Sequence, residues 1–295
     1  MRCKIKKKFR FSIHSQCGWR DEIKVQQALP NQFARAIGPF VFIEHILAYE
    51  RSLNEMHNGP LEKGPNPHRG ITILTYSLAG QVEHLDSIGN QVKLCSGGVH
   101  WTKAGKGIIY YETVRSEFQV ANSDVSVVRV WINLPSTRKS EQPDYLSVLS
   151  SEIPKQLLDA GAGWIKILLG EYKNVVAEIP YYSKEFFYHV HLEAGKQFPM
   201  IAEVRFEYAA FILANMVIIN NREFQAGELI VFTSLGEIIE MKNKNNTAVD
   251  IILFGGEPYM ETVVSDGNFV MNTPHEITQA YNDYYDGKYG QIKDH

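Results

Sequence analysis

The 295-residue sequence has little cysteine, almost no charge imbalance and no long apolar run. Its three cysteines, Cys3, Cys17 and Cys95, lie far apart without a pattern, which argues against a disulfide framework or a thiolate metal cluster and leaves them as ordinary thiols. A formal net charge of -3 gives no general attraction to nucleic acid, whose binding needs a basic face to release counterions. No stretch approaches the ~20 apolar residues that span a bilayer. We therefore expect a cytoplasmic protein without direct contact to nucleic acid or membrane.

Sequence signatures of several enzyme classes are also missing. There is no glycine-rich phosphate loop before a helix, no nucleophile elbow and no paired cysteine motif. The chain does contain apolar material for real cores, with 44% hydrophobic and 21% charged residues. Its length fits two domains of ordinary size.

Short segments of alternating apolar and polar residues, separated by turns, run through both halves of the chain. Many short strands at close spacing predict an all-β protein of barrels or sandwiches. The basic run 4–10 is typical of an edge strand protected by lysines. The other expected strands are 71–78, 82–86, 92–94, 99–102, 108–111, 125–134, 186–192, 206–215, 216–219, 228–232 and 251–254.

Two further segments differ in character. Residues 136–154 are polar, and we interpret them as a linker between the halves. Near the C-terminus, Thr273 precedes Pro274 and stands three residues before Glu276, which is the pattern of a capped helix start. Gly287 is the expected C-terminal cap. We therefore predict a short helix there, docked on a barrel wall.

The segment 65–70, Pro-Asn-Pro-His-Arg-Gly, resembles the signature of the pirin family, in which two histidines flank a proline before Arg-Gly. The agreement continues at 131–135 (Trp-Ile-Asn-Leu-Pro), 255–258 and 267–273. This resemblance implies two cupin-type β-barrel domains, at residues 1–137 and 138–295, with the C-terminal helix in the second. It also implies a single metal site in the N-terminal domain.

In the family that site has three histidines and one glutamate, which hold iron or another transition metal. Carried over residue by residue, His68 stands at the second histidine position and Glu112 at the glutamate position, whereas Asn66 and Tyr110 occupy the other two. Imidazole and carboxylate suit iron, nickel and copper. An amide oxygen is a weak donor, and a phenol with a pKa near ~10 must first lose its proton. We predict a half-retained site that holds one metal ion, iron by resemblance, weakly or not at all.

Other histidines have simpler interpretations than metal ligation. His100 lies near the pocket strands in sequence, but we do not expect it to replace a missing ligand. His189 and His191 form an H-x-H pair whose spacing to Glu193 does not match a cupin metal motif, so we predict polar residues on one barrel face, with a second site as the alternative. We expect His84 to satisfy a turn.

Three functions stay open. The resemblance implies a quercetin 2,3-dioxygenase-type activity, with Glu112 as metal ligand and catalytic base and His68 as a second ligand. The second is a non-enzymatic regulatory or protein-binding module, since a barrel can persist after its metal chemistry is lost. The third is a metal-free site in which Asn66, His68, Tyr110 and Glu112 surround a small molecule. We expect a monomer with a small-molecule or protein partner.

Overall fold

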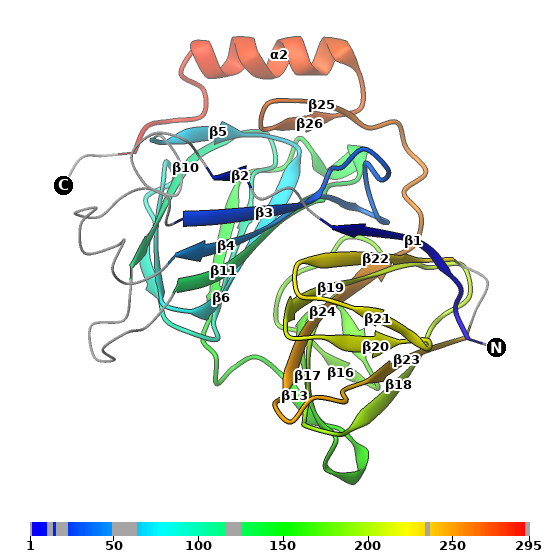
Figure 1. Cartoon of the computed structure of the whole chain (residues 1–295). Coiled ribbons are helices and arrows are strands. Elements are labelled where there is room, and N and C mark those ends of the chain that lie inside the picture. Colours follow the sequence, from blue (N-terminus) through cyan, green and yellow to red (C-terminus); the bar gives the residue numbers. More distant parts are fainter. Residues whose placement is uncertain are drawn as a thin grey trace. The chain divides into compact units, whose positions relative to one another are not determined.

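The structure, a computed structural model, describes residues 2–10, 14–15, 23–48, 64–115, 125–233 and 237–292. These residues form two compact units of antiparallel strands (Figure 1). We call the unit made of 14–15, 23–29, 40–48, 64–115, 125–152 and 260–292 the first barrel. The second barrel is made of 2–10, 30–39, 153–233 and 237–259. The predicted all-β class with one short C-terminal helix is confirmed. The expected division at residues 137 and 138 stays a prediction, and Cys17 lies outside the described residues.

The first barrel contains a seven-stranded sheet, a four-stranded sheet and a C-terminal hairpin with its helix. The seven-stranded sheet has the order β12-β9-β6-β11-β4-β3-β2, and the four-stranded sheet has the order β5-β10-β7-β8. Their strands are β2 (His14–Ser15), β3 (Ile23–Leu29), β4 (Phe40–Ala48), β5 (Asn66–His68), β6 (Ile71–Ala79), β7 (Gln81–Asp86), β8 (Gln91–Leu94), β9 (Val99–Lys103), β10 (Ile108–Arg115), β11 (Val125–Asn133) and β12 (Asp144–Val148), with a 3-10 turn η1 (Ser136–Arg138).

Period-two patterning explains why these segments become strands. In β10 the apolar residues Ile108, Tyr110 and Val114 are buried, while Ile109 and Tyr111 on the other face are partly exposed. The turn between β7 and β8 forms as predicted, because Oδ1 of Asp86 accepts hydrogen bonds from two backbone N–H groups of the turn. Alternation therefore fixes which side chains of each strand face the interior.

The segment 136–154 is not a linker, and this prediction was wrong. It contains β12, which pairs with β9 from Asp144 opposite Lys103 to Val148 opposite Val99. The polar composition of this segment gives no sign of strand β12, because the strand is formed by pairing with β9, about 40 residues earlier in the chain. Tertiary pairing, and not local propensity, decides its conformation.

The C-terminal helix is confirmed. Helix α2 (Pro274–Tyr285) begins with the predicted capping box, in which Thr273 and Glu276 bond each other's backbone N–H groups. It follows the hairpin of β25 (Val264–Asp266) and β26 (Phe269–Met271), and packs on it (Figure 1). The buried ammonium of Lys139 donates to the carbonyl of Val270 and so ties this hairpin to the barrel.

The second barrel has the sheets β1-β22-β19-β24-β17-β14-β13 and β18-β23-β20-β21, and a hairpin β15-β16. One large apolar cluster fills its interior. Its elements are β1 (Ile5–Arg10), β13 (Lys155–Leu157), η2 (Asp159–Gly161), β14 (Gly163–Leu169), β15 (Glu171–Tyr172), β16 (Val175–Val176), β17 (Glu185–Leu192), β18 (Gln197–Ile201), β19 (Glu207–Ala214), β20 (Val217–Ile219), β21 (Arg222–Phe224), β22 (Glu228–Phe232), β23 (Ile238–Lys242) and β24 (Val249–Gly256).

The basic run near the N-terminus forms β1, at one edge of the seven-stranded sheet of the second barrel. This confirms the expected edge strand. Lys8 Nζ lies 3.0 Å from Oε1 of Glu228 on the neighbouring strand β22. In the described part of the chain, no helix has the length and the apolar character needed to cross a membrane.

Candidate functional site

A layer of polar side chains crosses the interior of the first barrel. We define this polar layer as Glu44, Thr75, His84, His100, Glu112 and Arg129. In the seven-stranded sheet, Arg129 stands opposite both Thr75 and Glu44, and Thr75 stands opposite His100. In the four-stranded sheet, Glu112 stands opposite His84. Cross-strand register therefore brings together residues that are far apart in the sequence.

Apolar clusters enclose this layer on both sides. One cluster includes Val82, Val114 and Val127, and the other includes Ile73 and Trp131. On β11, for example, Arg129 lies two residues from a member of each cluster, so alternation places it between them. Two charged groups of the layer are nearly inaccessible to solvent, because Glu112 and Arg129 are each only 2% exposed. Burial of charge at this depth requires compensating partners.

Glu112 has partners at both carboxylate oxygens. Its Oε2 accepts a 3.0 Å hydrogen bond from the hydroxyl of Thr75 and lies 3.3 Å from Nη2 of Arg129. Its Oε1 lies 3.6 Å from Nδ1 of His84. Burial alone would raise the pKa of Glu112, but the contact with His84 and the charge of Arg129 outweigh it and bring the pKa to about 2. Glu112 is therefore a carboxylate, paired within the protein.

His84 links Glu112 to the rim of the barrel. Its Nε2 lies 3.0 Å from Oδ2 of Asp86, and its ring stacks on Tyr145 with centroids 4.6 Å apart. Burial would lower the pKa of His84, but the hydrogen bond to Asp86 and the proximity of Glu112 outweigh this and raise it, which favours the imidazolium. The expected contact with a turn is present, because Asp86 caps the β7–β8 turn. His84 also contacts the candidate site, which the sequence did not predict.

His68, Asn66 and Tyr110 lie side by side at the end of the polar layer. Tyr110 on β10 stands opposite Asn66 on β5, and the rings of Tyr110 and His68 are 4.6 Å apart. Nδ1 of His68 donates to the carbonyl of Asn66 over 3.2 Å, which leaves the lone pair on Nε2. Burial lowers the pKa of His68 to about 3, so the ring is neutral. The structure thus brings the four predicted site residues onto β5 and β10, with Glu112 two residues beyond Tyr110.

His100 belongs to the polar layer but is engaged elsewhere. Its Nδ1 forms a hydrogen bond with the hydroxyl of Tyr145 on β12. Burial lowers the pKa of His100 to about 4. The ring of His100 is therefore neutral, like that of His68. It lies beside the ring of His84, at a centroid distance of 5.5 Å.

The side chains as placed do not fit a divalent transition metal. Among the described residues, no group of three or more His, Cys, Asp or Glu side chains converges as a metal site would require. Glu112 already faces the positive charges of Arg129 and His84, and these would repel a further cation. Buried imidazole nitrogens favour a ligand: within the described structure, Nε2 of His68, Nε2 of His100 and Nδ1 of His84 have no hydrogen-bond partner. Nδ1 of His84 faces Glu112 at 3.6 Å, which leaves the nitrogens of His68 and His100 open. Two imidazole nitrogens beside a paired carboxylate fall short of a converging metal-ligand set.

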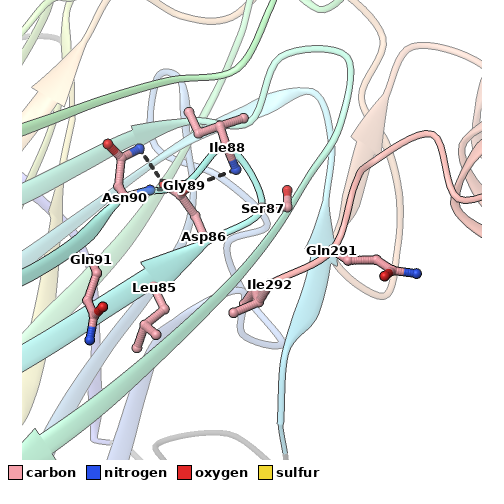
Figure 2. A pocket seen from close by; sticks show the side chains of 9 residues that line it. All are labelled: Leu85, Asp86, Ser87, Ile88, Gly89, Asn90, Gln91, Gln291 and Ile292. Atoms are coloured by element: carbon pink, nitrogen blue, oxygen red, sulfur yellow. Dashed lines mark hydrogen bonds between the residues drawn. The ribbon is translucent and has the colours of Figure 1, made fainter. Parts of the chain in front are cut away.

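A cavity of about 320 Å³ lies outside the polar layer, beside the β7–β8 turn (Figure 2). Its lining combines apolar and carboxamide side chains of the turn with two residues of the C-terminal tail. Asp86 is shared by this cavity and the contact to His84, whereas Asn66, His68, Tyr110 and Glu112 do not line it. The lining residues are Leu85, Asp86, Ser87, Ile88, Gly89, Asn90, Gln91, Gln291 and Ile292.

Comparison with known proteins identifies the family. The sequence matches the pirin model over residues 22–132 and the pirin C-terminal cupin domain over residues 187–290. It is 30% identical to Pirin-1 of Arabidopsis thaliana over 230 residues, 76% of this chain and 77% of that protein. The chain belongs to the pirin family. Both of its domains are therefore cupin-type, as predicted.

Solved structures agree with the pirin fold. A quercetin 2,3-dioxygenase from Acinetobacter baumannii superposes with a TM-score of 0.85 at 23% identity, covering 99% of this chain and 100% of that one. The bacterial pirin YhhW from Escherichia coli, in complex with nickel(II), superposes with a TM-score of 0.63 at 16% identity, covering 87% of this chain and 98% of that one. At these identities the likeness concerns the fold alone.

Sequence reasoning missed part of the site of this pirin-family chain. Arg129 and Thr75 sit inside segments predicted only as strands, and Tyr145 sits in the segment assigned to a linker. A charged residue in the run 127–131, which is otherwise apolar, was the available signal for Arg129, since an unpaired charge is not tolerated in a core.

In the second barrel, His189 and His191 share one sheet face and both contact Oδ1 of Asp250, as expected for polar face residues.

Proposed function

We propose that this pirin-family chain is a non-enzymatic protein-binding module whose first barrel no longer serves as a metal centre. The proposal is carried by the contacts of Glu112, because its two oxygens are held by Arg129, Thr75 and His84. Guanidinium and imidazolium supply the positive charge that a metal ion would otherwise bring to this carboxylate. The polar layer then acts as a structural part of the barrel interior.

The burial of the polar layer and of the predicted site residues beside it supports a surface-based function. His68 and His84 are 0% exposed, and Tyr110 is 1% exposed. A small molecule cannot reach these side chains without movement of the barrel walls, whose cores are closely packed on both sides of the layer. The exposed faces of the sheets remain for contacts with another macromolecule.

Two measurements on the protein from its own host test this proposal. Affinity capture with the wild-type chain should recover a specific protein partner, and metal analysis of chain purified without chelator should give well under one ion per chain. His68→Ala should leave the capture unchanged. The proposal fails if no partner is recovered, and its claim of a lost metal centre fails if a stoichiometric metal is found.

A quercetin 2,3-dioxygenase-type activity is the second candidate. It is favoured by the buried Nε2 of His68, which has no hydrogen-bond partner in the described structure, and by the fold shared with a protein of that name. The test is quercetin loss under air after loading with iron, copper or nickel. If turnover appears, and both His68→Ala and Glu112→Gln abolish it together with metal binding, this candidate replaces the first.

A further inference from the structure

Strand β13 presents a free edge at the end of the seven-stranded sheet of the second barrel. Among the strands of the described residues it pairs only with β14, from Lys155 opposite Lys166 to Leu157 opposite Trp164. Backbone bonds flank this pairing, from Ile167 N–H to the Pro154 carbonyl and from Leu158 N–H to the Gly163 carbonyl. Hydrogen-bonded positions alternate along an antiparallel pair, so the N–H and C=O groups of Lys155 and Leu157 point away from the sheet. They can accept one more strand.

The side chains beside this edge combine apolar surface with positive charge. Leu157 is 74% exposed, and Trp164 beside it on β14 is partly exposed. The ammonium groups of Lys155 and Lys166 lie 5.6 and 5.8 Å from the centroid of the Trp164 ring. Ile165, which lies between Trp164 and Lys166, faces the core instead. Leucine, tryptophan and both lysines therefore occupy one outward face.

The two lysines are like charges in directly opposed positions, an arrangement that destabilises a sheet. The pKa of Lys166 is lowered by partial burial and then by the charge of Lys155. The carboxylate of Asp250, whose Oδ1 contacts both His189 and His191 at 2.9 and 2.7 Å, lies on β24, and β17 and β14 separate it from β13. The two lysines on β13 and β14 therefore stand nearer to the free edge than this carboxylate does.

We propose that the edge of β13 binds an extended acidic segment of the partner protein as an added strand, with a carboxylate opposite Lys155 and an apolar side chain opposite Leu157. This inference rests on the proposed function as a protein-binding module. Because opposed residues on one face are two positions apart, the partner segment has the pattern acidic-any-apolar, or its reverse. The same lysine disfavours neutral and basic strands at this edge, which limits self-association.

Two variants of the full chain test separately how the backbone groups of the edge and the charge of its lysine contribute to partner binding. Leu157→Pro removes an outward N–H without touching the bonds to β14, and proline is tolerated at such edge positions. Lys155→Glu reverses the charge and leaves every backbone group in place. Lys106→Glu, at an exposed lysine of the first barrel, is the matched control. Thermal unfolding of each variant checks that the fold is retained.

Each chain is used to capture partners from extract of its host, and the affinity for the purified partner of the wild-type chain is then measured. We expect both edge variants to bind at least ~10-fold more weakly and the control to bind as the wild type does. Peptides tiled along the partner should show binding only for segments with the acidic-any-apolar pattern. If both edge variants keep wild-type affinity, the inference is overturned while the proposed function stands. If the wild-type chain captures no partner, the proposed function itself fails. If sedimentation shows that the captured partner is a second copy of this chain, the acidic partner is overturned.

Discussion

Nη2 of Arg129 lies 3.3 Å from Oε2 of Glu112, and both side chains are buried in the middle of the first barrel. The same guanidinium lies 3.4 Å from Glu44 through Nη1. One cation therefore serves two carboxylates at a depth where an unpaired charge would be costly. In this arrangement the carboxylate at the family's glutamate position is part of the barrel's own charge balance.

Arg129→Met should strongly destabilise the chain. Removal of the guanidinium leaves Glu112 and Glu44 without their shared cation, and loss of one partner of a buried pair costs about 3–5 kcal/mol. Urea unfolding of both proteins measures the difference. Arg138→Met, at an arginine whose side chain is 54% exposed in its pair with Glu141, is the matched control and should change the unfolding free energy much less. Equal effects of the two substitutions would contradict a structural role for the buried pair.

Restoring the two missing histidines should not by itself restore tight metal binding. Asn66→His with Tyr110→His completes the family's donor set, yet Arg129 and His84 still place positive charge beside Glu112. Adding Arg129→Gln removes one of these charges, and we expect nickel(II) to bind at least ~10-fold more tightly to the triple variant than to the double variant. Equilibrium dialysis measures both affinities. Tight stoichiometric nickel binding by the wild-type chain would refute the proposed loss of the metal centre.

Glu185 in the second barrel should make stability depend on pH. Burial raises the pKa of Glu185 to about 7, although the hydrogen bonds from Ser183 and the backbone of Tyr182 oppose the shift. Between pH ~4.5 and 7 the folded state therefore holds a proton on Glu185 that the unfolded state has already released. The contribution of Glu185 to the unfolding free energy is fully present below pH ~4.5 and is lost as the pH rises through 7. The loss attributable to this group is about 3 kcal/mol at most. Unfolding curves between pH 4.5 and 7.5 should show a weaker decline for Glu185→Gln, and an identical decline would contradict the assignment.

The capping box of α2 should contribute measurably to the docking of the C-terminal segment. Thr273→Ala removes the hydroxyl that accepts a 3.2 Å bond from the N–H of Glu276, which costs about 1 kcal/mol. Thr273→Ser keeps the hydroxyl and serves as the control. Hydrogen exchange of the first-turn amides of α2 should accelerate in the alanine variant and stay near the wild-type rate in the serine variant. Equal rates in the two variants would show that the cap is not used.

Local sequence rules predicted many of the elements. The alternation in 71–86 and 125–134 and the glycine-marked turns correspond to β6, β7 and β11 within one or two residues. The capping box at Thr273 was readable because it depends only on residues three apart. Short strands such as β12 and β13 were missed, because their conformation depends on a neighbour that local sequence does not reveal.

The sequence by itself determined the alternation of apolar and polar residues along the strands and the capped helix. It also placed His68 and Glu112 at two of the four family metal-ligand positions, with Asn66 and Tyr110 at the others. Only the tertiary structure decided that Arg129, Thr75 and His84 surround Glu112 and that β13 is left as an edge. The reason is physical: side-chain alternation and capping are set by covalent neighbours, whereas cross-strand contacts depend on which distant strands pair and in which register.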